Sequence, residues 1–383
     1  MRDCVLLRPT SRSHLQLVES RIPFAALVVL AVGCAESASN AVGDGDSPGA
    51  PRVSLIGTIE LEQSDTFFVG RPISLAIDAL DGTLYVADAL NQRVARFGRD
   101  GRLVRTYGTP GSGPGEIGLA RGVFLADSYV VVTDTRAGTL VLYDRQDGDF
   151  QRSVPLIGYT GNVFSTASDT AWIGVRDPTT GTVITGWAVD TDSLVHVGQI
   201  PDEFEEYPQI ARAQGLPVVS WADSLLVGFG LLNTVFLYSK AGSVLDTIPI
   251  PVRYRRGNSK ESFERADGSA VKLANSTSAL WGMHKMPSGD VALVHYDLTV
   301  EERGDRPRIR NTTVYLSVLR NDLATACVDR RVAVESDAQP VIQFLGDTLF
   351  MVRQRVENES ASLFMSIWQI DTGPCSWVRV PVG

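Results

Sequence analysis

The chain has 383 residues, of which 44% are hydrophobic and 21% are charged, and its formal net charge is −9. Its length exceeds the usual ceiling of about 250 to 300 residues for a single hydrophobic core, unless each unit of a repeat packs mainly against its neighbours. The acidic charge argues against nucleic acid as a partner, because the phosphates would be repelled.

The N-terminal segment has the pattern of an exported protein. Four arginines precede the apolar run Ile22 to Val32, which is too short to span a bilayer but suits the core of a signal peptide. The sequence Leu30-Ala31-Val32-Gly33-Cys34 resembles a bacterial lipobox, and this implies cleavage before Cys34 and lipid attachment to its thiol. The alternative is an ordinary signal peptide cut slightly later. We therefore expect residues 1–33 to be a signal peptide and the Ala/Ser/Gly/Asp/Pro-rich residues 34–52 to be a flexible tether. The expected location is the bacterial cell envelope, with the protein facing the periplasm or the exterior.

The stretch from Pro72 to Gly118 has the clearest pattern in the chain. Four short apolar runs alternate at period two and are separated by turn signals such as Asp81-Gly82 and Asp100-Gly101, as in β-strands. Four strands in about 45 residues are typical of one blade of a β-propeller. The runs Leu84 to Asp88, Asn91 to Val94 and Gly111 to Glu116 resemble the NHL-repeat family. This resemblance implies a propeller architecture and no particular activity, because propellers host many functions.

A hairpin signature recurs six times along the chain, in which a strand ends and an Asp with Ser, Thr or Gly precedes the next strand. Asp suits these turns because its side chain can bond its own backbone. We therefore predict an all-β fold, a six-bladed β-propeller of four-stranded antiparallel blades around a central channel, over residues 53–383. The run Val53 to Leu61 is predicted to close the ring by pairing with the last blade. Trp377 to Val380 is predicted as a fourth strand, and only Asp202 to Gln214 suggests a helical turn. The six hairpins centre on Asp81, Asp127, Asp169, Asp223, Asp290 and Asp347.

Four long connections carry the extra residues of the chain. Links between second and third strands, and between blades, share one face of a propeller, so these inserts should crowd one rim and form a binding site there. Arg beside Tyr suits a small anionic or carbohydrate ligand, or a cell-envelope protein in a sensory or scaffold role. The alternative is that the loops pair with one another. We expect joint replacement of Arg253, Arg255 and Arg256 to abolish binding without unfolding the protein. The inserts are Thr109 to Gly118, Pro201 to Leu216, Arg253 to Lys272 and Leu298 to Asn311. The candidate ligand-binding residues are Arg71, Arg121, Tyr207, Arg253, Tyr254, Arg255, Arg256, Arg306 and Arg308.

A metal-dependent hydrolase or lyase with its site in the central channel is the alternative function. The gluconolactonase and paraoxonase type holds calcium with carboxylates at the starts of inner strands, and the peptide-amidating lyase type holds zinc with histidines. Here Arg71 and Arg121 occupy two such starts, and His196, His284 and His295 fall in different predicted blades. The sequence therefore predicts no catalytic residue, metal or cofactor, favours binding, and leaves catalysis open.

Two cysteines remain once Cys4 leaves with the signal peptide and Cys34 is assigned to the lipid. Cys327 and Cys375 fall near outer strands of neighbouring predicted blades. An oxidising compartment would allow a disulfide between them. Two separate thiols are the alternative, since sequence alone does not give the distance between them.

Overall fold

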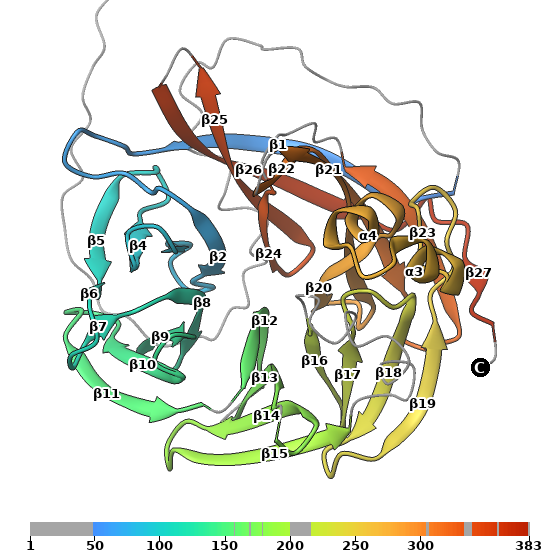
Figure 1. The fold of residues 1–383 in the computed structure, drawn as a ribbon, viewed down its shortest axis with the longest axis horizontal. Coiled ribbons are helices and arrows are strands. Elements are labelled where there is room, and N and C mark those ends of the chain that lie inside the picture. Colours follow the sequence, from blue (N-terminus) through green and yellow to red (C-terminus); the bar gives the residue numbers. More distant parts are fainter. Residues whose placement is uncertain are drawn as a thin grey trace, which may run out of the picture. The chain divides into compact units, whose positions relative to one another are not determined.

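Six antiparallel sheets are arranged in a ring in the computed structural model, which confirms the predicted six-bladed β-propeller (Figure 1). The structure describes residues 49–156, 158–167, 170–177, 179–199, 216–303, 306–332, 339–357 and 360–381. The ring lies within one compact unit, Asp44–Gly383. The predicted signal peptide, Cys34 and most of the predicted tether lie outside the described residues.

Blades 1 to 4 each contain four consecutive strands in the order in which they occur in the chain. Blade 1 consists of β2 (Pro72–Ile77), β3 (Leu84–Asp88), β4 (Arg93–Phe97) and β5 (Leu103–Tyr107). Blade 2 consists of β8 (Ala120–Ala126), β9 (Tyr129–Asp134), β10 (Thr139–Asp144) and β11 (Phe150–Pro155). Blade 3 consists of β12 (Tyr159–Ala167), β13 (Thr170–Arg176), β14 (Thr182–Ala188) and β15 (Ser193–Gln199). Blade 4 consists of β16 (Val218–Trp221), β17 (Ser224–Gly228), β18 (Thr234–Ser239) and β19 (Val244–Pro249).

Blades 5 and 6 draw strands from distant parts of the chain. Blade 5 consists of β20 (Ala279–Lys285), β21 (Val291–Arg303), β22 (Arg306–Leu319), β23 (Thr325–Val332) and the short β27 (Val378–Arg379). Blade 6 consists of β24 (Val341–Leu345), β25 (Thr348–Glu357), β26 (Ser360–Asp371) and the N-terminal β1 (Arg52–Leu61). A two-residue parallel pair, β6 (Thr109–Pro110) and β7 (Glu116–Ile117), lies in the link from blade 1 to blade 2.

The N-terminal strand closes the ring, as predicted. Strand β1 pairs antiparallel with β26 from Arg52↔Asp371 to Leu61↔Leu363 and so covers the edge of blade 6. The prediction that Trp377 to Val380 forms the fourth strand of this blade was wrong. Because β1 occupies that edge, the chain after β26 continues to blade 5, where β27 pairs with β23. A disulfide between Cys327 and Cys375, with Cα atoms 5.6 Å apart, joins the C-terminal segment to β23.

The core lies between neighbouring blades. Every residue of β3 is buried, because the second strand of a blade has a neighbouring blade against each of its two faces. Tyr85 and Val94 of blade 1 pack with Val123 and Val130 of blade 2 in one such cluster. Burying a Val or Leu side chain contributes about 1.5 to 3 kcal/mol. This two-sided burial explains why the second-strand runs are apolar almost without interruption.

The predicted hairpin turns connect the first and second strands of their blades. The turns contain residues with positive φ, among them Gly82 (70°), Asp127 (49°) and Ala222 (48°). Asp81 accepts a hydrogen bond from the backbone N–H of Thr83 at 2.9 Å, which is the local turn chemistry expected of Asp. The turn at 168–169 lies outside the described residues, although β12 and β13 flank it.

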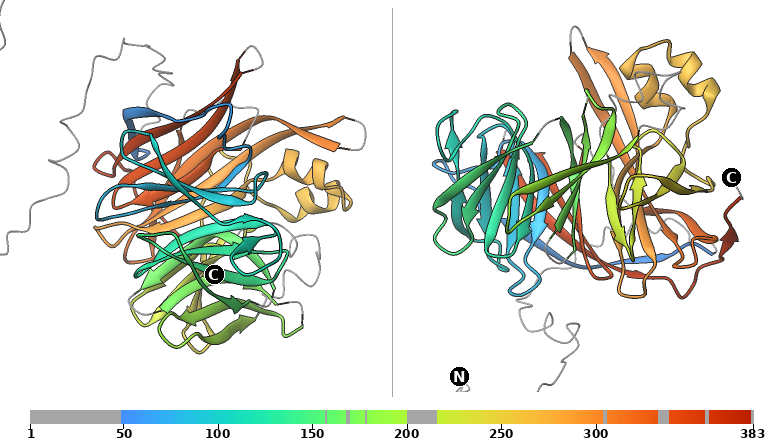
Figure 2. Two further views of the ribbon diagram at one scale, coloured as in Figure 1. Left: turned by 90° about the vertical axis from the view of Figure 1, so that its left-hand side faces the viewer. Right: turned by 90° about the horizontal axis from the view of Figure 1, so that it is seen from below.

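Two short helices in the link from blade 4 to blade 5 were missed by the sequence interpretation. Helix α3 (Lys260–Ala266) begins after Ser259, and α4 (Ala270–Ser276) begins after Ser269, whose side chains cap the helices. The capping serines and the apolar spacing of Phe263 and Ala266 were readable signals. The predicted helical turn at 202–214 lies outside the described residues. In Figure 2, α3, α4 and the projecting part of the β21–β22 hairpin lie on the same side of the ring.

Candidate functional site

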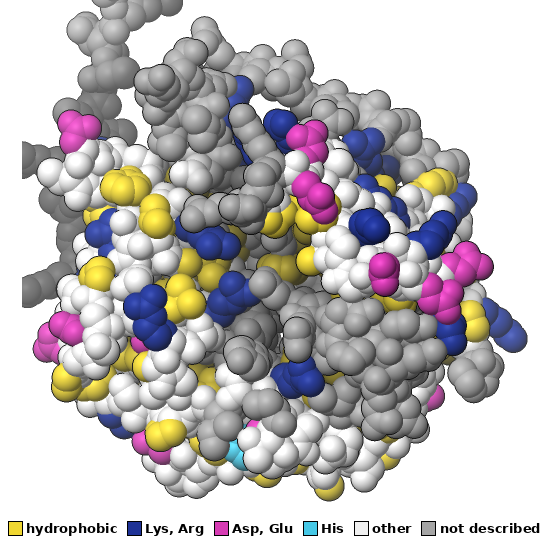
Figure 3. Space-filling view, viewed as in Figure 1, with side chains coloured by type: hydrophobic (Ala, Val, Ile, Leu, Met, Phe, Trp, Pro, Cys, Tyr) yellow, Lys and Arg dark blue, Asp and Glu magenta, His cyan; other side chains and the backbone are white. Residues whose placement is uncertain are grey.

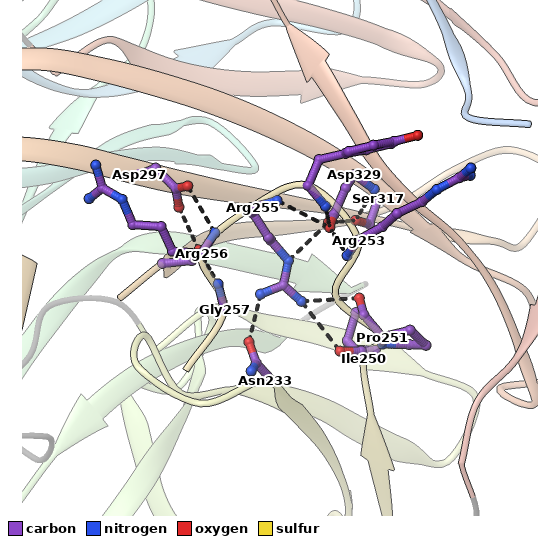
Figure 4. A network of polar contacts seen from close by, with 12 residues as sticks. Asn233, Ile250, Pro251, Arg253, Arg255, Arg256, Gly257, Asp297, Ser317 and Asp329 are labelled. Atoms are coloured by element: carbon purple, nitrogen blue, oxygen red, sulfur yellow. Dashed lines mark hydrogen bonds and ion pairs between the residues drawn. The ribbon is translucent and has the colours of Figure 1, made fainter. Parts of the chain in front are cut away.

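The insert that follows blade 4 is fixed to blade 5 by a buried ion pair. The Arg255 guanidinium donates through Nε to Asp329 Oδ1 at 2.9 Å, and both side chains are fully inaccessible to solvent. The other carboxylate oxygen of Asp329 accepts the backbone N–H groups of Arg253 at 2.5 Å and Tyr254 at 2.9 Å. Figure 4 shows Arg255 at the centre of this network.

The remaining donors of Arg255 are also used inside the protein. Its Nη1 donates to Asn233 Oδ1 at 2.6 Å, and its Nη2 donates to the carbonyls of Ile250 and Pro251, each at 3.3 Å. Burial lowers the pKa of Arg255, and the neighbouring Asp329 opposes that shift. The predicted ligand-binding Arg255 therefore lies where it holds the link in place, because a charge so far from water is retained only when it is paired.

Arg256 is tied to the same insert through its backbone and its side chain. Its N–H donates to Asp297 Oδ2 at 3.0 Å, and its guanidinium donates to the Ala274 carbonyl of α4 at 3.0 Å and to the Leu298 carbonyl. Asn275 of α4 adds two hydrogen bonds of 2.8 Å with the backbone of Val300. The helical insert is thus attached along the projecting part of β21. The expectation that Arg253, Arg255 and Arg256 can be replaced together without unfolding conflicts with this burial and bonding.

The other predicted residues of the inserts are placed as follows. Arg253 and Tyr254 are exposed and in contact, with the guanidinium 4.9 Å from the ring centroid. Arg308 is exposed on β22. Arg306 begins the same strand, and its side chain lies outside the described part of the structure. Tyr207 lies outside the described residues.

Arg71 is fixed at the entrance to the inner strand of blade 1. Asp88, at the end of β3, accepts the N–H groups of Gly70 at 3.0 Å and Arg71 at 2.9 Å. The carbonyl of Arg71 accepts the N–H of Ala89 at 2.9 Å. The exposed fraction of Asp88 is 0%, so its carboxylate is committed to the backbone of this link. The Arg71 side chain itself is exposed.

Arg121 reaches the same region from blade 2 in a different way. Asp134 repeats the role of Asp88 and accepts the N–H groups of Gly118 at 2.6 Å and Leu119 at 3.0 Å. Ala120 pairs with Asp134 and Gly122 with Thr133, so Arg121 is the extra residue of a β-bulge. A bulge redirects a side chain. The sequence placed Arg71 and Arg121 at matching starts of two inner strands. The strand pairing instead matches Arg121 with Ile73, so the two arginines are not equivalent residues of their blades.

The two arginines stand at the starts of neighbouring inner strands, since β2 and β8 lie side by side and the N–H of Val123 donates to Ser74 Oγ at 3.1 Å. Burial lowers the pKa of Arg121, and the positive charge of Arg71 lowers it further. No hydrogen bond or ion pair joins either guanidinium to a residue that the structure describes. A half-buried Arg121 and an exposed Arg71 of like charge, with no carboxylate partner among the described residues, favour an anion beside them. We call Arg71 and Arg121 the arginine pair. Figure 3 shows Lys and Arg side chains beside hydrophobic ones around the hollow at the middle of this face.

The described residues offer no metal-binding cluster of three or more His, Cys, Asp or Glu. His284 is stacked on Phe344 with the ring centroids 5.1 Å apart and lies 3.1 Å, through Nε2, from the Gly346 carbonyl. His295 is buried within blade 5, and His196 contacts Thr185 at 3.0 Å. The three histidines thus have separate surroundings. Within the described ranges no helix is long and apolar enough to cross a membrane.

A cavity of about 640 Å³ lies apart from the arginine pair, where β1 meets the turn between β4 and β5. It is lined by Glu60, Leu61, Glu62, Gln63, Asp100, Gly101, Arg102 and Ser362. Glu62 is engaged there, since its carboxylate accepts the N–H of Leu103 at 2.9 Å. This acidic cavity belongs to the ring closure.

Comparison with known proteins supports the fold. No family model and no curated protein matches the chain. A member of the DUF4221 family from Bacteroides vulgatus matches with a TM-score of 0.61 and 11% identity, over 85% of this chain and 99% of that one. A "putative exported protein" from Bacteroides fragilis matches with a TM-score of 0.56 and 12% identity, over 83% of this chain and 95% of that one. At these identities the likeness extends to the propeller fold alone.

Proposed function

We propose that this protein is an exported, lipid-anchored β-propeller that binds an anionic ligand at the arginine pair. The observation that carries the proposal is that Arg71 and Arg121 stand at the starts of the neighbouring strands β2 and β8 with no carboxylate partner among the described residues. Arginine presents a planar fork of donors that matches carboxylate and phosphate groups. Because Asp88 and Asp134 fix the backbone on which the two arginines stand, the pair is organised before a ligand arrives.

The face that carries the arginine pair supports a binding role. Long connections on a rigid scaffold are common places for binding. Here the insert with α3 and α4 is bonded to β21 through Arg256 and Asn275, so it extends the rigid surface. Arg253, Tyr254 and Arg308 are exposed on the inserts and could contact a ligand larger than one anionic group.

A binding measurement with poly-L-glutamate tests the anion site. Arg71→Gln combined with Arg121→Gln is expected to weaken binding at least ~10-fold at low ionic strength, since charge-assisted bonds contribute about 1.5 to 3 kcal/mol each. Added salt should weaken binding to the wild type, because exposed charges are screened. Arg102→Gln is the matched control, as Arg102 is an exposed arginine on a turn of the opposite face. Equal binding by all three proteins would refute the proposal.

Export and lipid attachment have a separate test. The lipobox-like sequence before Cys34 and the fold shared with the Bacteroides fragilis protein support the envelope location. In a bacterial host, the wild-type chain should fractionate with membranes and incorporate labelled palmitate. Cys34→Ser should do neither. Membrane association unaffected by this substitution would exclude the proposed anchor.

A further inference from the structure

Two large apolar side chains near the backbone of Arg71 remain exposed. Phe68 is 48% exposed and Leu90 is 60% exposed. Leu90 packs over Gly70, where an added Cβ would lie 3.0 Å from the Leu90 Cβ. Gly70 directly precedes Arg71, and the carbonyl of Arg71 bonds the N–H of Ala89. Leu90 and Phe68 are therefore presented by the same backbone framework as Arg71.

The backbone of this patch is held on several sides. The Phe68 carbonyl accepts Asn91 Nδ2 at 3.0 Å and Arg93 Nη2 at 2.8 Å. The N–H of Leu90 donates to Asp88 Oδ1 at 3.1 Å. The two exposed side chains are thus presented by a fixed framework. A partner that contacts them would lose little free energy to ordering of the loop.

Several other exposed apolar residues lie on outer strands or on the opposite face. Val104 and Leu245 are 54% and 56% exposed on outer strands, and single exposed apolar side chains are normal there. Leu80, which is 85% exposed, lies in the turn between β2 and β3 on the opposite face. Beside Arg71, two large apolar side chains that are about half exposed lie near a guanidinium group that has no bonded partner in the described chain. Aromatic residues and Arg are the side chains enriched at binding hot spots.

We propose that the arginine pair recognises a peptide segment in which a carboxylate side chain stands next to a large apolar side chain. The carboxylate bridges Arg71 and Arg121, and the apolar side chain packs on Leu90 and Phe68. This inference rests on the proposed function and narrows its ligand class. The patch is open, so it suits the side chains of a peptide better than an acyl chain, which gains most from enclosure. An acidic polysaccharide would supply carboxylates but no large apolar group for Leu90.

Fluorescence anisotropy with labelled, end-blocked octapeptides tests the proposal. The probe is Gly-Ser-Leu-Glu-Glu-Leu-Ser-Gly, and two partners carry Gln in place of Glu or Ser in place of Leu. The purified protein should bind the first peptide ~10-fold more tightly than the Gln peptide and about three- to tenfold more tightly than the Ser peptide.

Variants of the protein locate the contact. Leu90→Ser and Phe68→Ser should each weaken binding of the Leu-containing peptide about threefold to tenfold and leave binding of the Ser peptide unchanged, as a pairwise contact requires. Leu80→Ser is the control and should change neither. Both Phe68 and Leu90 are exposed, so these substitutions leave the core intact.

The outcomes separate the two proposals. Equal affinity for the Leu-containing and Ser peptides, with a preference for both over the Gln peptide, would overturn the peptide inference and leave the anion site standing. Loss of binding in Leu80→Ser equal to that in Leu90→Ser would also overturn the inference. If no peptide binds and poly-L-glutamate also fails to bind, both proposals fall.

Discussion

Arg255 is buried and Arg121 is half-buried, and the two arginines differ in what surrounds them. Arg255 has Asp329, Asn233 and two backbone carbonyls, which occupy all its directions. Arg121 has Arg71 beside it and no bonded partner in the described chain. The sequence assigned the same role to both. The bonded partners of an arginine, rather than its residue type, therefore distinguish one that holds the fold from one that is available to a ligand.

The largest expected effect comes from breaking the buried ion pair. Arg255→Met should lower the free energy of unfolding by about 3 to 5 kcal/mol, because it leaves the Asp329 carboxylate buried without its charge partner. Urea denaturation followed by circular dichroism measures this. Arg253→Gln, two residues before Arg255 and on an exposed side chain, should lower the free energy of unfolding by less than about 1 kcal/mol. Similar losses for the two variants would remove the distinction drawn here.

Acid should act on blade 5 rather than on the arginine pair. Burial lowers the pKa of His284 from 6.5 to about 4, against the opposing hydrogen bond with Gly346. Burial, together with the Arg255 charge, also holds the pKa of His295 well below its usual range. Both histidines are neutral in the folded protein and take up protons on unfolding. The two histidines therefore do not lower the free energy of unfolding above about pH 6.5. This free energy decreases as the pH falls from there toward 4.

His284→Gln isolates one part of this effect. A shift of this size corresponds to at most about 3 kcal/mol, at 1.36 kcal/mol per pKa unit. Between pH 6.5 and pH 4 the free energy of unfolding of the variant should therefore fall by up to about 3 kcal/mol less than that of the wild type. Denaturation at several pH values in this window provides the measurement. Identical pH dependence in the two proteins would show that His284 does not titrate as its burial requires.

The smallest effect on stability is expected at the arginine pair. Arg71→Gln with Arg121→Gln should change the free energy of unfolding by less than about 0.5 kcal/mol, or raise it, since like-charge repulsion is removed and no ion pair is lost. The same denaturation experiment applies. A loss above about 2 kcal/mol would mean that the pair supports the fold as Arg255 does, and the contrast between the two regions would fail.

Much of the ring could be predicted because its signals are local. The run Leu84 to Ala87 is apolar at every position because a blade covers each face of β3. Turn residues such as Asp81 and Gly82 have chemistry that needs no tertiary context. The closing strand was predictable because it was an unassigned apolar run before the first blade. The sequence did not reveal that Trp377 to Val380 would then join blade 5 instead of blade 6. That outcome depends on β1 already occupying the edge of blade 6.

The candidate site depended on longer-range contacts. Arg255 and Asp329 are 74 residues apart, and their pairing has no sequence signature. Blades 1 and 2 have the same bulge at the start of the inner strand, so Arg121 matches Ile73 and lies two residues out of register with Arg71, which an alignment of blade starts does not reveal. Short helices such as α3 were missed because strong strand periodicity elsewhere outweighed the weak capping signals at Ser259 and Ser269.

By itself the sequence determined the class of fold and the number of blades, because period-two patterning and turn residues act over a few residues. Only the tertiary structure decided which arginines are consumed by the fold and which remain available. That choice depends on desolvation and on the partners within about 4 Å of each charge, and these partners come from blades far apart in the chain.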